Sequence, residues 1–282
     1  MKNAIYMLNG GSGVYAQDLL NSFIITSESG TVIVIDGGHD RSVNHFLEKI
    51  KEITGQDVPH IDAWILTHTH CDHIQCFTDI MTNRPGSVVV DRVIYNFFYT
   101  GEEIIAEHGK ESIKIFNFMR DFYVFITDYK GEKIIPEVGD VFTVKEFTFE
   151  TLHTAKVVTG ARDANNKSLV LKMTFNDKTV MFCGDLGVRG GNKVLETFPR
   201  EKLKSDMCQM AHHGQCGVEK NFYEAVSPKI CLWPTPDYLY NNDLGKGYNT
   251  AFFKTIEVQG WMKEIGAKEH YVIKDGDQEI PL

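Results

Sequence analysis

The sequence predicts an α+β fold in which two packed β-sheets carry helices on their outer faces. Apolar strand-like runs alternate with amphipathic stretches through two successive halves, so that each half mixes strands with helices. Turn-forming segments such as Ser27-Glu28-Ser29-Gly30 and Asn176-Asp177-Lys178 join neighbouring runs. The chain has 282 residues, enough to bury a sizeable core.

The first half supplies one predicted sheet with its helices. We expect strands at 22–27, 31–36, 61–67 and 87–95, and helices at 41–53 and 74–81. A helical insertion follows around 100–130, with apolar residues at helical spacing: Ile115, Phe118, Met119, Phe122 and Ile126. This stripe indicates either core packing or a side wall over a binding site.

The second half repeats the mixture. We expect strands at 140–144, 146–152, 168–175, 178–183, 206–211 and 230–233, helices at 191–197, 219–226 and 250–264, and a closing hairpin through 274–277. Together the two halves predict two sheets packed face to face.

Composition excludes several classes of protein. The net charge is −9 and no run is rich in Lys or Arg, so a small-molecule substrate is favoured over extended nucleic acid. No stretch approaches eighteen apolar residues, which argues against a membrane-spanning helix. The first thirteen residues are a poor signal peptide, and the six cysteines form no CxxC pair. We therefore expect a cytoplasmic protein.

The most informative motif follows the predicted strand at 61–67. His68-Thr69-His70-Cys71-Asp72-His73 places four metal-binding side chains in six positions. His68 and His70 alternate along the chain and reach one side of it, while the loop after them turns Asp72 and His73 toward a neighbouring point. Four donors this close suit two adjacent divalent ions better than one.

Two later strands end in the same kind of turn. Asp185 follows the apolar run 180–183 and Gly184, and a carboxylate at a strand end can bridge two ions with its two oxygens. His212-His213-Gly214 follow the strand at 206–211, where the two imidazoles offer one ligand and one supporting or acid–base group. The repeated design, a strand and then a ligand loop, predicts that the three loops meet.

With these motifs the chain resembles the metallo-β-lactamase superfamily. The resemblance rests on HTHCDH at 68–73, CGD at 183–185 and AHHG at 211–214, with the strand and Asp-Gly turn at 32–38 in support. It is most similar to the ComEC/Rec2-type and phosphorylcholine-esterase-like branch, through Asn165-Asn166-Lys167-Ser168-Leu169-Val170-Leu171. The resemblance implies a four-layer αβ/βα sandwich of two mixed sheets, as a single free-standing domain over 1–282 without a membrane part.

One position departs from the superfamily pattern. Most members place a third histidine for the first ion shortly before the Gly-Asp turn, and Asn165 or Asn166 stands there in this chain. An amide oxygen is a weaker and harder ligand than imidazole, so we expect a weaker or partly water-filled first site. His153, at a nearby strand end, is the alternative third donor.

The resemblance assigns a role to each residue of the motifs. His68 and His70 bind the first ion, Asp72 and His73 bind the second, Asp185 bridges them, and His213 completes the second ion. His212 then contacts substrate or donates a proton. The alternative is the reverse order, with His212 as the ligand and His213 in the other role. We expect zinc because most donors are imidazoles, with manganese or iron as alternatives.

The expected reaction is hydrolysis by a hydroxide that bridges the two ions, with Asp72 orienting it and His212 as the acid. The branch points to a small phosphoester, and thus to a phosphodiesterase-like enzyme. The alternatives are a carbonyl-ester hydrolase, such as a lactonase or thioesterase, and a catalytically silent ligand-binding scaffold. An oxygen-reducing di-iron protein is disfavoured, because such members resemble HxE where this chain has His70. The aromatic segments 95–99 and 233–240 either line a substrate pocket or pack in the core.

Overall fold

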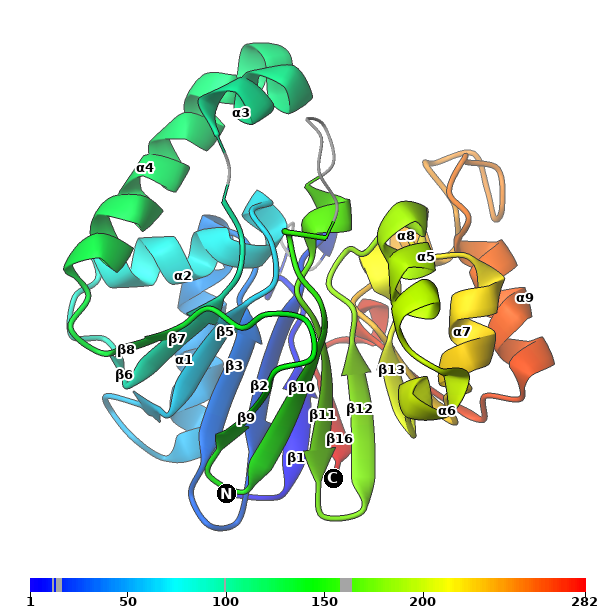
Figure 1. Ribbon diagram of the computed structural model, residues 1–282. Helices are drawn as coiled ribbons and strands as arrows, with labels where there is room; N and C mark the ends of the chain where they lie inside the picture. The colour runs from blue at the N-terminus through cyan, green and yellow to red at the C-terminus, as the bar shows by residue number, and fades with distance from the viewer. Residues whose placement is uncertain (12, 14–16, 99, 158–163) are drawn as a thin grey trace.

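Two seven-stranded sheets form the centre of the molecule (Figure 1). The computed structural model describes residues 1–11, 13, 17–98, 100–157 and 164–282. The first sheet has the order β16-β1-β2-β3-β5-β7-β8 and contains β1 (Ala4–Met7), β2 (Ser22–Thr26), β3 (Val32–Asp36), β5 (Ala63–Leu66), β7 (Arg92–Tyr95), β8 (Glu132–Ile134) and β16 (Gln278–Pro281). Two short strands, β4 (His60–Ile61) and β6 (Val89–Val90), pair beside it.

The second sheet has the order β15-β14-β13-β12-β11-β10-β9. Its strands are β9 (Val141–Val144), β10 (Phe147–His153), β11 (Val170–Phe175), β12 (Lys178–Phe182), β13 (Met207–Gln209), β14 (Ile230–Trp233) and β15 (Glu269–Val272). Both sheets combine antiparallel pairs, such as β2 with β3 and β10 with β11, with parallel pairs, such as β3 with β5 and β12 with β13. The prediction of two mixed sheets is confirmed.

Helices cover the outer face of each sheet (Figure 1). Beside the first sheet lie α1 (Val43–Thr54), α2 (Cys71–Asn83), α3 (Gly101–His108) and α4 (Ser112–Asp128). Beside the second lie α5 (Val188–Thr197), α6 (Arg200–Leu203), α7 (Lys220–Val226), α8 (Asp237–Tyr240) and α9 (Thr255–Ile265). The layers therefore run helix, sheet, sheet, helix, as predicted.

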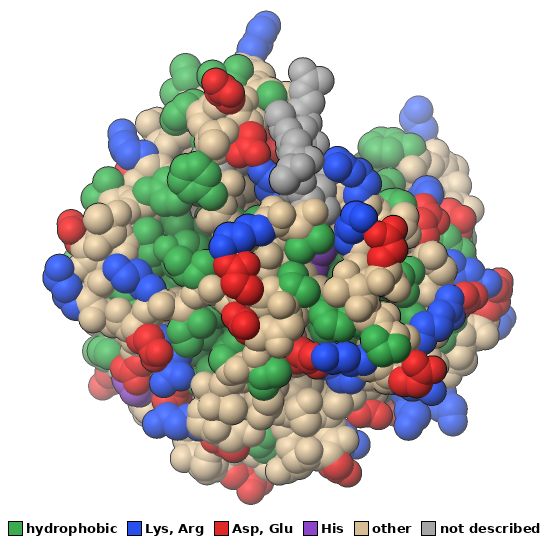
Figure 2. Space-filling view, in the orientation of Figure 1, with side chains coloured by type: hydrophobic (Ala, Val, Ile, Leu, Met, Phe, Trp, Pro, Cys, Tyr) green, Lys and Arg blue, Asp and Glu red, His purple; other side chains and the backbone are tan. Residues whose placement is uncertain are grey.

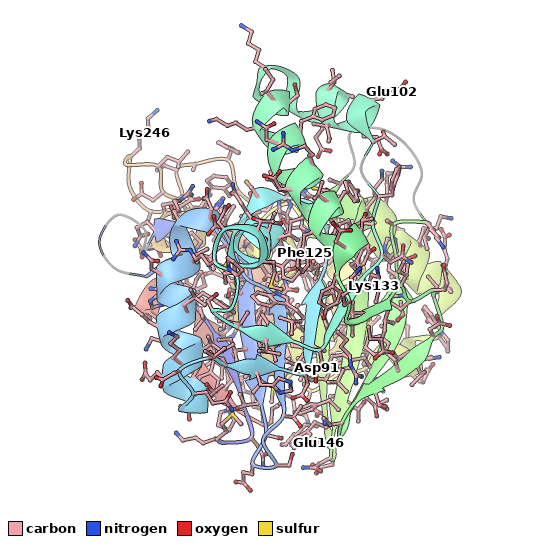
Figure 3. All side chains as sticks on the ribbon, turned by 90° about the vertical axis from the view of Figure 1, so that its left-hand side faces the viewer. Asp91, Glu102, Phe125, Lys133, Glu146 and Lys246 are labelled. Atoms are coloured by element: carbon pink, nitrogen blue, oxygen red, sulfur yellow. The ribbon has the colours of Figure 1, made fainter. Side chains whose placement is uncertain are left out.

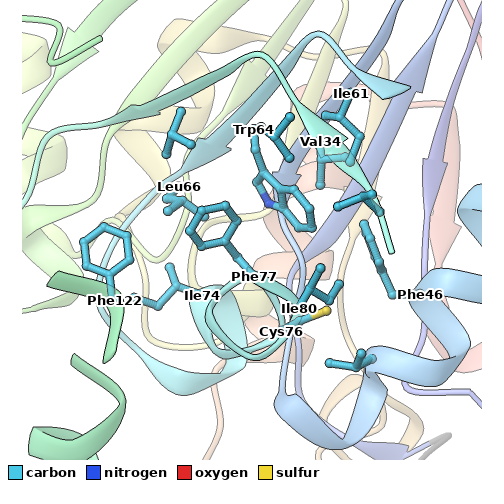
Figure 4. Packing of buried hydrophobic residues seen from close by; sticks show 14 of the residues in the cluster. Val34, Phe46, Ile61, Trp64, Leu66, Ile74, Cys76, Phe77, Ile80 and Phe122 are labelled. Carbon is cyan, nitrogen blue, oxygen red and sulfur yellow. The ribbon is translucent and has the colours of Figure 1, made fainter. Parts of the chain in front are cut away.

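Strand β5 shows how the sequence builds these layers. Side chains of a strand alternate between its two faces. Ala63 and Ile65 therefore join the apolar layer between the sheets, while Trp64 and Leu66 join the layer under the helices, and all four are fully buried. Trp64 stacks on Phe46 of α1 with ring centroids 5.2 Å apart (Figure 4). A strand buried on both faces fixes the position of the loop that follows it.

The insertion between β7 and β8 consists of α3, α4 and the short turn that joins them. Phe118, Met119, Phe122 and Ile126 of α4 are buried in the layer that also contains α2, so the stripe is core packing. Helix α3 projects beyond the end of the sheets (Figures 1 and 3). The core-packing interpretation of the stripe therefore holds, while α3, which lies outside the stripe, stands beside the edge where the ligand loops emerge.

Two sequence-based predictions were wrong. Asp72 and His73 lie in the first turn of α2 and not in a loop, because His70 is the extended residue that starts this helix. An acidic side chain in the first turn is favoured by the helix dipole. The predicted closing hairpin does not form, because β15 pairs with β14 in the second sheet and β16 pairs with β1 in the first. The turn at 274–277 carries the chain from one sheet to the other.

Candidate metal centre

The three predicted ligand loops meet at one end of the two sheets. The first loop joins β5 to α2, the second follows β12, and the third is the short turn η5 (Ala211–Gly214) after β13. Strands β5 and β12 belong to opposite sheets, so the site is built where the sheets face each other. Figure 2 shows a hollow between the two helical layers with histidine surface in it.

The site contains two overlapping sets of donor atoms. One set consists of Asp72, His73, Asp185 and His213, and the other of His68, His70 and Asp185. Within each set the donor atoms all lie within 4.8 Å of one another. The structure thus brings together all six residues that the sequence assigned to two ions, in the same two groups.

Asp185 joins the two sets through different oxygens. Its Oδ1 lies 3.1 Å from Nε2 of His73 and 3.5 Å from Nε2 of His213. Its Oδ2 lies 3.9 Å from Nε2 of His68 and 3.7 Å from Nε2 of His212. The carboxylate, almost fully buried, therefore presents one oxygen to each set, which is the arrangement of a bridging ligand.

Hydrogen bonds at Nδ1 orient the imidazoles of His73 and His213 so that Nε2 points toward the other donors. His73 donates from Nδ1 to Asp36 Oδ2 at 2.7 Å, and His213 donates from Nδ1 to the Pro234 carbonyl oxygen at 2.8 Å. A hydrogen bond at Nδ1 leaves Nε2 as the metal-binding nitrogen and raises its basicity. Asp36 lies at the end of β3, and its role as the partner of His73 was not assigned from sequence, although its Asp-Gly turn was noted.

A tight backbone turn forms the loop after β13. His212 and His213 have left-handed conformations, with φ of 51° and 55°, which non-glycine residues rarely adopt. Gly214 follows with φ of +75°, and a Cβ there would lie 2.5 Å from the Trp233 ring. Backbone strain of this kind persists where surrounding packing fixes it, and it often accompanies functional sites.

The buried acidic and basic side chains of the site shift one another's pKa. Burial raises the pKa of a carboxyl group, yet His73 and His213 outweigh this and hold the pKa of both Asp72 and Asp185 below the usual range. Burial, together with the charge of His73, lowers the pKa of His68 well below its ordinary value. Burial lowers the pKa of His73 and His213, but Asp185 outweighs it and raises both above the ordinary value, so these imidazoles are protonated without a metal. Ionised carboxylates and neutral imidazoles are the forms that bind divalent metals, so metal binding would release these protons.

The donor atoms also fit a metal by their lack of other partners. His68 Nε2, His73 Nε2 and Asp185 Oδ1 are buried and make no hydrogen bond of good geometry among the described residues, although His73 Nε2 and Asp185 Oδ1 lie 3.1 Å from each other. Buried polar atoms are normally satisfied, so such a group of orphans at one point needs an explanation. Two divalent cations would satisfy all of them. The candidate di-metal site is thus supported by the chemistry of the residues present.

The three candidates for a third donor to the first ion lie in different environments. His153 is fully buried, donates from Nδ1 to the Ser168 carbonyl oxygen at 2.9 Å, and belongs to neither donor set. Asn166 accepts from the backbone N–H of Gly190 at 2.7 Å. Asn165 contacts His212, with Nδ2 3.4 Å from His212 Nε2, and its buried Oδ1 has no hydrogen bond among the described residues.

A cavity of about 260 Å³ opens beside the donors and is lined by Glu107, Ala164, Asn165, Asn166, Gly187, Val188, Arg189, His212 and Cys216. Neither predicted aromatic segment contributes to this lining within the described residues. Trp233 is fully buried beneath the second helical layer, and Tyr95 and Phe97 pack in the first; Tyr99 lies outside the described residues. Phe98, however, is 67% exposed, and Tyr238 is half-buried and close enough to Asp72 for burial and this carboxylate to raise its pKa. Trp233 and Phe97 are therefore core, whereas Tyr238 lies near the donors.

Glu107 is a site residue that the sequence did not indicate. It lies on α3, and its Oε1 is 3.2 Å from His70 Nε2. Burial lowers the pKa of His70, but the hydrogen bond with Glu107 and the charge of Asp72 raise it above its ordinary value. No motif marks this glutamate, because its contact depends on how the insertion folds back over the loop.

A profile of the metallo-beta-lactamase superfamily matches residues 17–224. The chain belongs to this superfamily. The matched range contains all six members of the two donor sets. This establishes the superfamily on the same loops that the geometry identifies.

A curated relative supports the ComEC-type branch. The chain is 26% identical over 181 residues to ComE operon protein 3 of Bacillus subtilis (strain 168). The match covers 64% of this chain and 20% of that protein.

No helix among the described residues has the length and apolar character needed to cross a bilayer.

Solved structures confirm the metallo-β-lactamase fold. YhfI from Bacillus subtilis, a metallo-beta-lactamase fold protein, is similar with a TM-score of 0.55 and 14% identity, over 99% of this chain and 100% of that one. CmlA, a diiron beta-hydroxylase from Streptomyces venezuelae, has a TM-score of 0.54 and 10% identity, over 100% of this chain and 55% of that one. These likenesses concern the fold alone.

Proposed function

We propose that this protein is a binuclear metal-dependent hydrolase of a small phosphoester. The observation that carries the proposal is the Asp185 carboxylate, whose two oxygens face two different sets of donors. His68 and His70 would hold one ion, and Asp72, His73 and His213 the other. When bound, two divalent ions supply a water molecule of lowered pKa and stabilise the negative charge that develops on the attacked group.

We propose zinc as the metal, because His68, His70, His73 and His213 supply four imidazoles. Manganese and iron are the alternatives, since carboxylates also contribute to both sets and harder donors suit those ions. Metal analysis of protein purified without added metal distinguishes the three.

Two residues are proposed to act on the reactants. Asp72 Oδ2 lies 3.2 Å from His213 Nε2, which places this carboxylate beside the second set, and we assign it the orientation of the attacking water. His212 lines the cavity, and its Nε2 lies 3.7 Å from Asp185 Oδ2, the oxygen that faces the first set. We assign it the donation of a proton to the leaving oxygen.

The cavity supports an anionic substrate. Arg189 lies in the first turn of α5 and lines the cavity, and a guanidinium favours a phosphate group. The ComEC-type branch, with its likeness to phosphorylcholine esterases, favours phosphoesters as well. The net charge of −9 argues against extended nucleic acid, so we propose a small molecule.

We propose that the protein functions in the cytoplasm. All six cysteines are free thiols, including the buried pair Cys183 and Cys208, whose sulfur atoms lie 3.9 Å apart. Thiols remain reduced in the cytosol, whereas oxidising compartments favour disulfides.

The test compares hydrolysis of bis(p-nitrophenyl) phosphate, p-nitrophenylphosphorylcholine and a simple lactone by metal-loaded protein. Asp72→Asn and Asp185→Asn should each lower phosphoester hydrolysis by at least about 100-fold, because each removes a charged donor at the site of charge development. Asp177→Asn, in an exposed turn, is the matched control and should leave the rate unchanged. Hydrolysis that survives both site substitutions would rule the mechanism out, and hydrolysis of the lactone alone would make the protein a carbonyl-ester hydrolase.

The proton donor has a separate test. His212→Gln should slow a phosphodiester with an alkyl leaving group by about 100-fold or more, the ordinary contribution of a general acid. The same substitution should change p-nitrophenyl ester hydrolysis far less, because that leaving group needs no proton. Equal losses for both substrates would contradict the assignment.

A further inference from the structure

Helix α3 contacts the region of the metal centre through two glutamates. Glu103 and Glu107 are one helical turn apart, so they lie on the same face of α3. Glu103 forms an ion pair with Lys167, a nearly buried residue of η4 (Asn165–Lys167), and Glu107 contacts His70. A capping box with Thr100 fixes the start of the helix. Two different site loops therefore hold this face of α3.

The two donor sets are unequal without α3. The second set has two imidazoles and two carboxylates, whereas the first has two imidazoles and one carboxylate. Asn165 stands where most superfamily members have a third histidine, so the first set lacks that imidazole. Glu107 Oε1 lies 3.2 Å from His70 Nε2, a separation that two ligands of one ion can have, although Glu107 is not within 4.8 Å of every donor of the set.

We propose that Glu107 completes the first metal site as a carboxylate ligand supplied by the insertion. This inference rests on the proposed binuclear function. Each ion would then have two imidazoles and two carboxylates, with Asp185 shared. The insertion becomes part of the metal centre, so that binding of the first ion and docking of α3 stabilise each other.

The experiment measures zinc binding by chelator competition for the wild type, Glu107→Gln and Glu102→Gln. Glu102 is exposed on the same helix and carries the same charge, so it is the matched control (Figure 3). We expect Glu107→Gln to lower the affinity for one of the two zinc ions by at least about 10-fold and to leave the affinity for the other unchanged. This is the size of effect that loss of a metal-site partner has. Glu102→Gln should bind both ions like the wild type.

Amide hydrogen exchange supplies a second readout. Adding zinc to the wild type should slow exchange of the α3 amides, and in Glu107→Gln this protection should be lost. The folding control is the melting temperature of each metal-free variant, which should equal that of the metal-free wild type. If Glu107→Gln binds two ions as tightly as the wild type and keeps the protection, the inference is wrong while the proposed function stands. If the wild type itself binds no zinc, manganese or iron, the proposed function fails first.

Discussion

Replacement of Asp36 by asparagine should damage both the fold and the second metal site. The buried carboxylate accepts four hydrogen bonds: from Asn21 Nδ2, His73 Nδ1, Thr67 N and Thr67 Oγ1, at 2.7–2.8 Å. Asparagine has the same shape and tolerates the φ of 56° at this position. Either orientation of its amide, however, turns an NH₂ group toward at least one buried donor.

The magnitude follows from these contacts. An unsatisfied buried donor and the loss of a charge-assisted bond to His73 together cost roughly 2–4 kcal/mol of unfolding free energy. Since Asp36 also orients His73, affinity for one of the two ions should fall by about 10- to 100-fold. Urea unfolding of metal-free protein measures the first effect, and chelator competition measures the second. The exposed Asp57→Asn is the control. Wild-type stability together with wild-type affinity in Asp36→Asn would refute this reasoning.

Three further changes test other parts of the structure. Phe122→Ala should lower the unfolding free energy by about 3–5 kcal/mol in urea titrations, because the ring is fully buried between α4 and α2; a loss below 1 kcal/mol would contradict this. Gly214→Ala should cost roughly 2–4 kcal/mol, since its Cβ meets the Trp233 ring at a left-handed φ, and a wild-type melting temperature would be the opposing result. Hydrogen bonds from hydroxyls of the β2–β3 turn outweigh burial and lower the pKa of Glu146 from 4.5 to about 2. Its exposed carboxylate therefore contributes up to about 1 kcal/mol of unfolding free energy above pH 4.5, and this contribution is lost toward pH 2. In urea titrations, Glu146→Gln should be less stable than the wild type at pH 7 and equally stable near pH 2; equal stability at pH 7 would contradict this.

The metal loops could be predicted because their chemistry is local. His68, His70, Asp72 and His73 lie within six residues, and Asp185 and His213 each follow a strand that the apolar pattern already marks. Strands that are buried on both faces leave little choice about where their ends lie. The grouping of the donors into two sets followed from alternation along the chain and from the superfamily pattern.

Contacts between distant segments could not be read in the same way. Glu107 reaches His70 only because the insertion folds back, and nothing in its local sequence distinguishes it from the exposed Glu102. The prediction of a closing hairpin was wrong for a related reason. An Asp-Gly turn suits a hairpin and a crossing between sheets equally well, and the choice depends on free edges at β14 and β1 that only the assembled sheets define.

The most direct test of two ions sharing Asp185 is anomalous X-ray diffraction from crystals of metal-loaded protein. We expect two anomalous peaks about 3.5–4 Å apart, one beside His68 and His70 and one beside Asp72, His73 and His213, with the Asp185 carboxylate between them. A single peak, or peaks away from Asp185, would contradict the binuclear site.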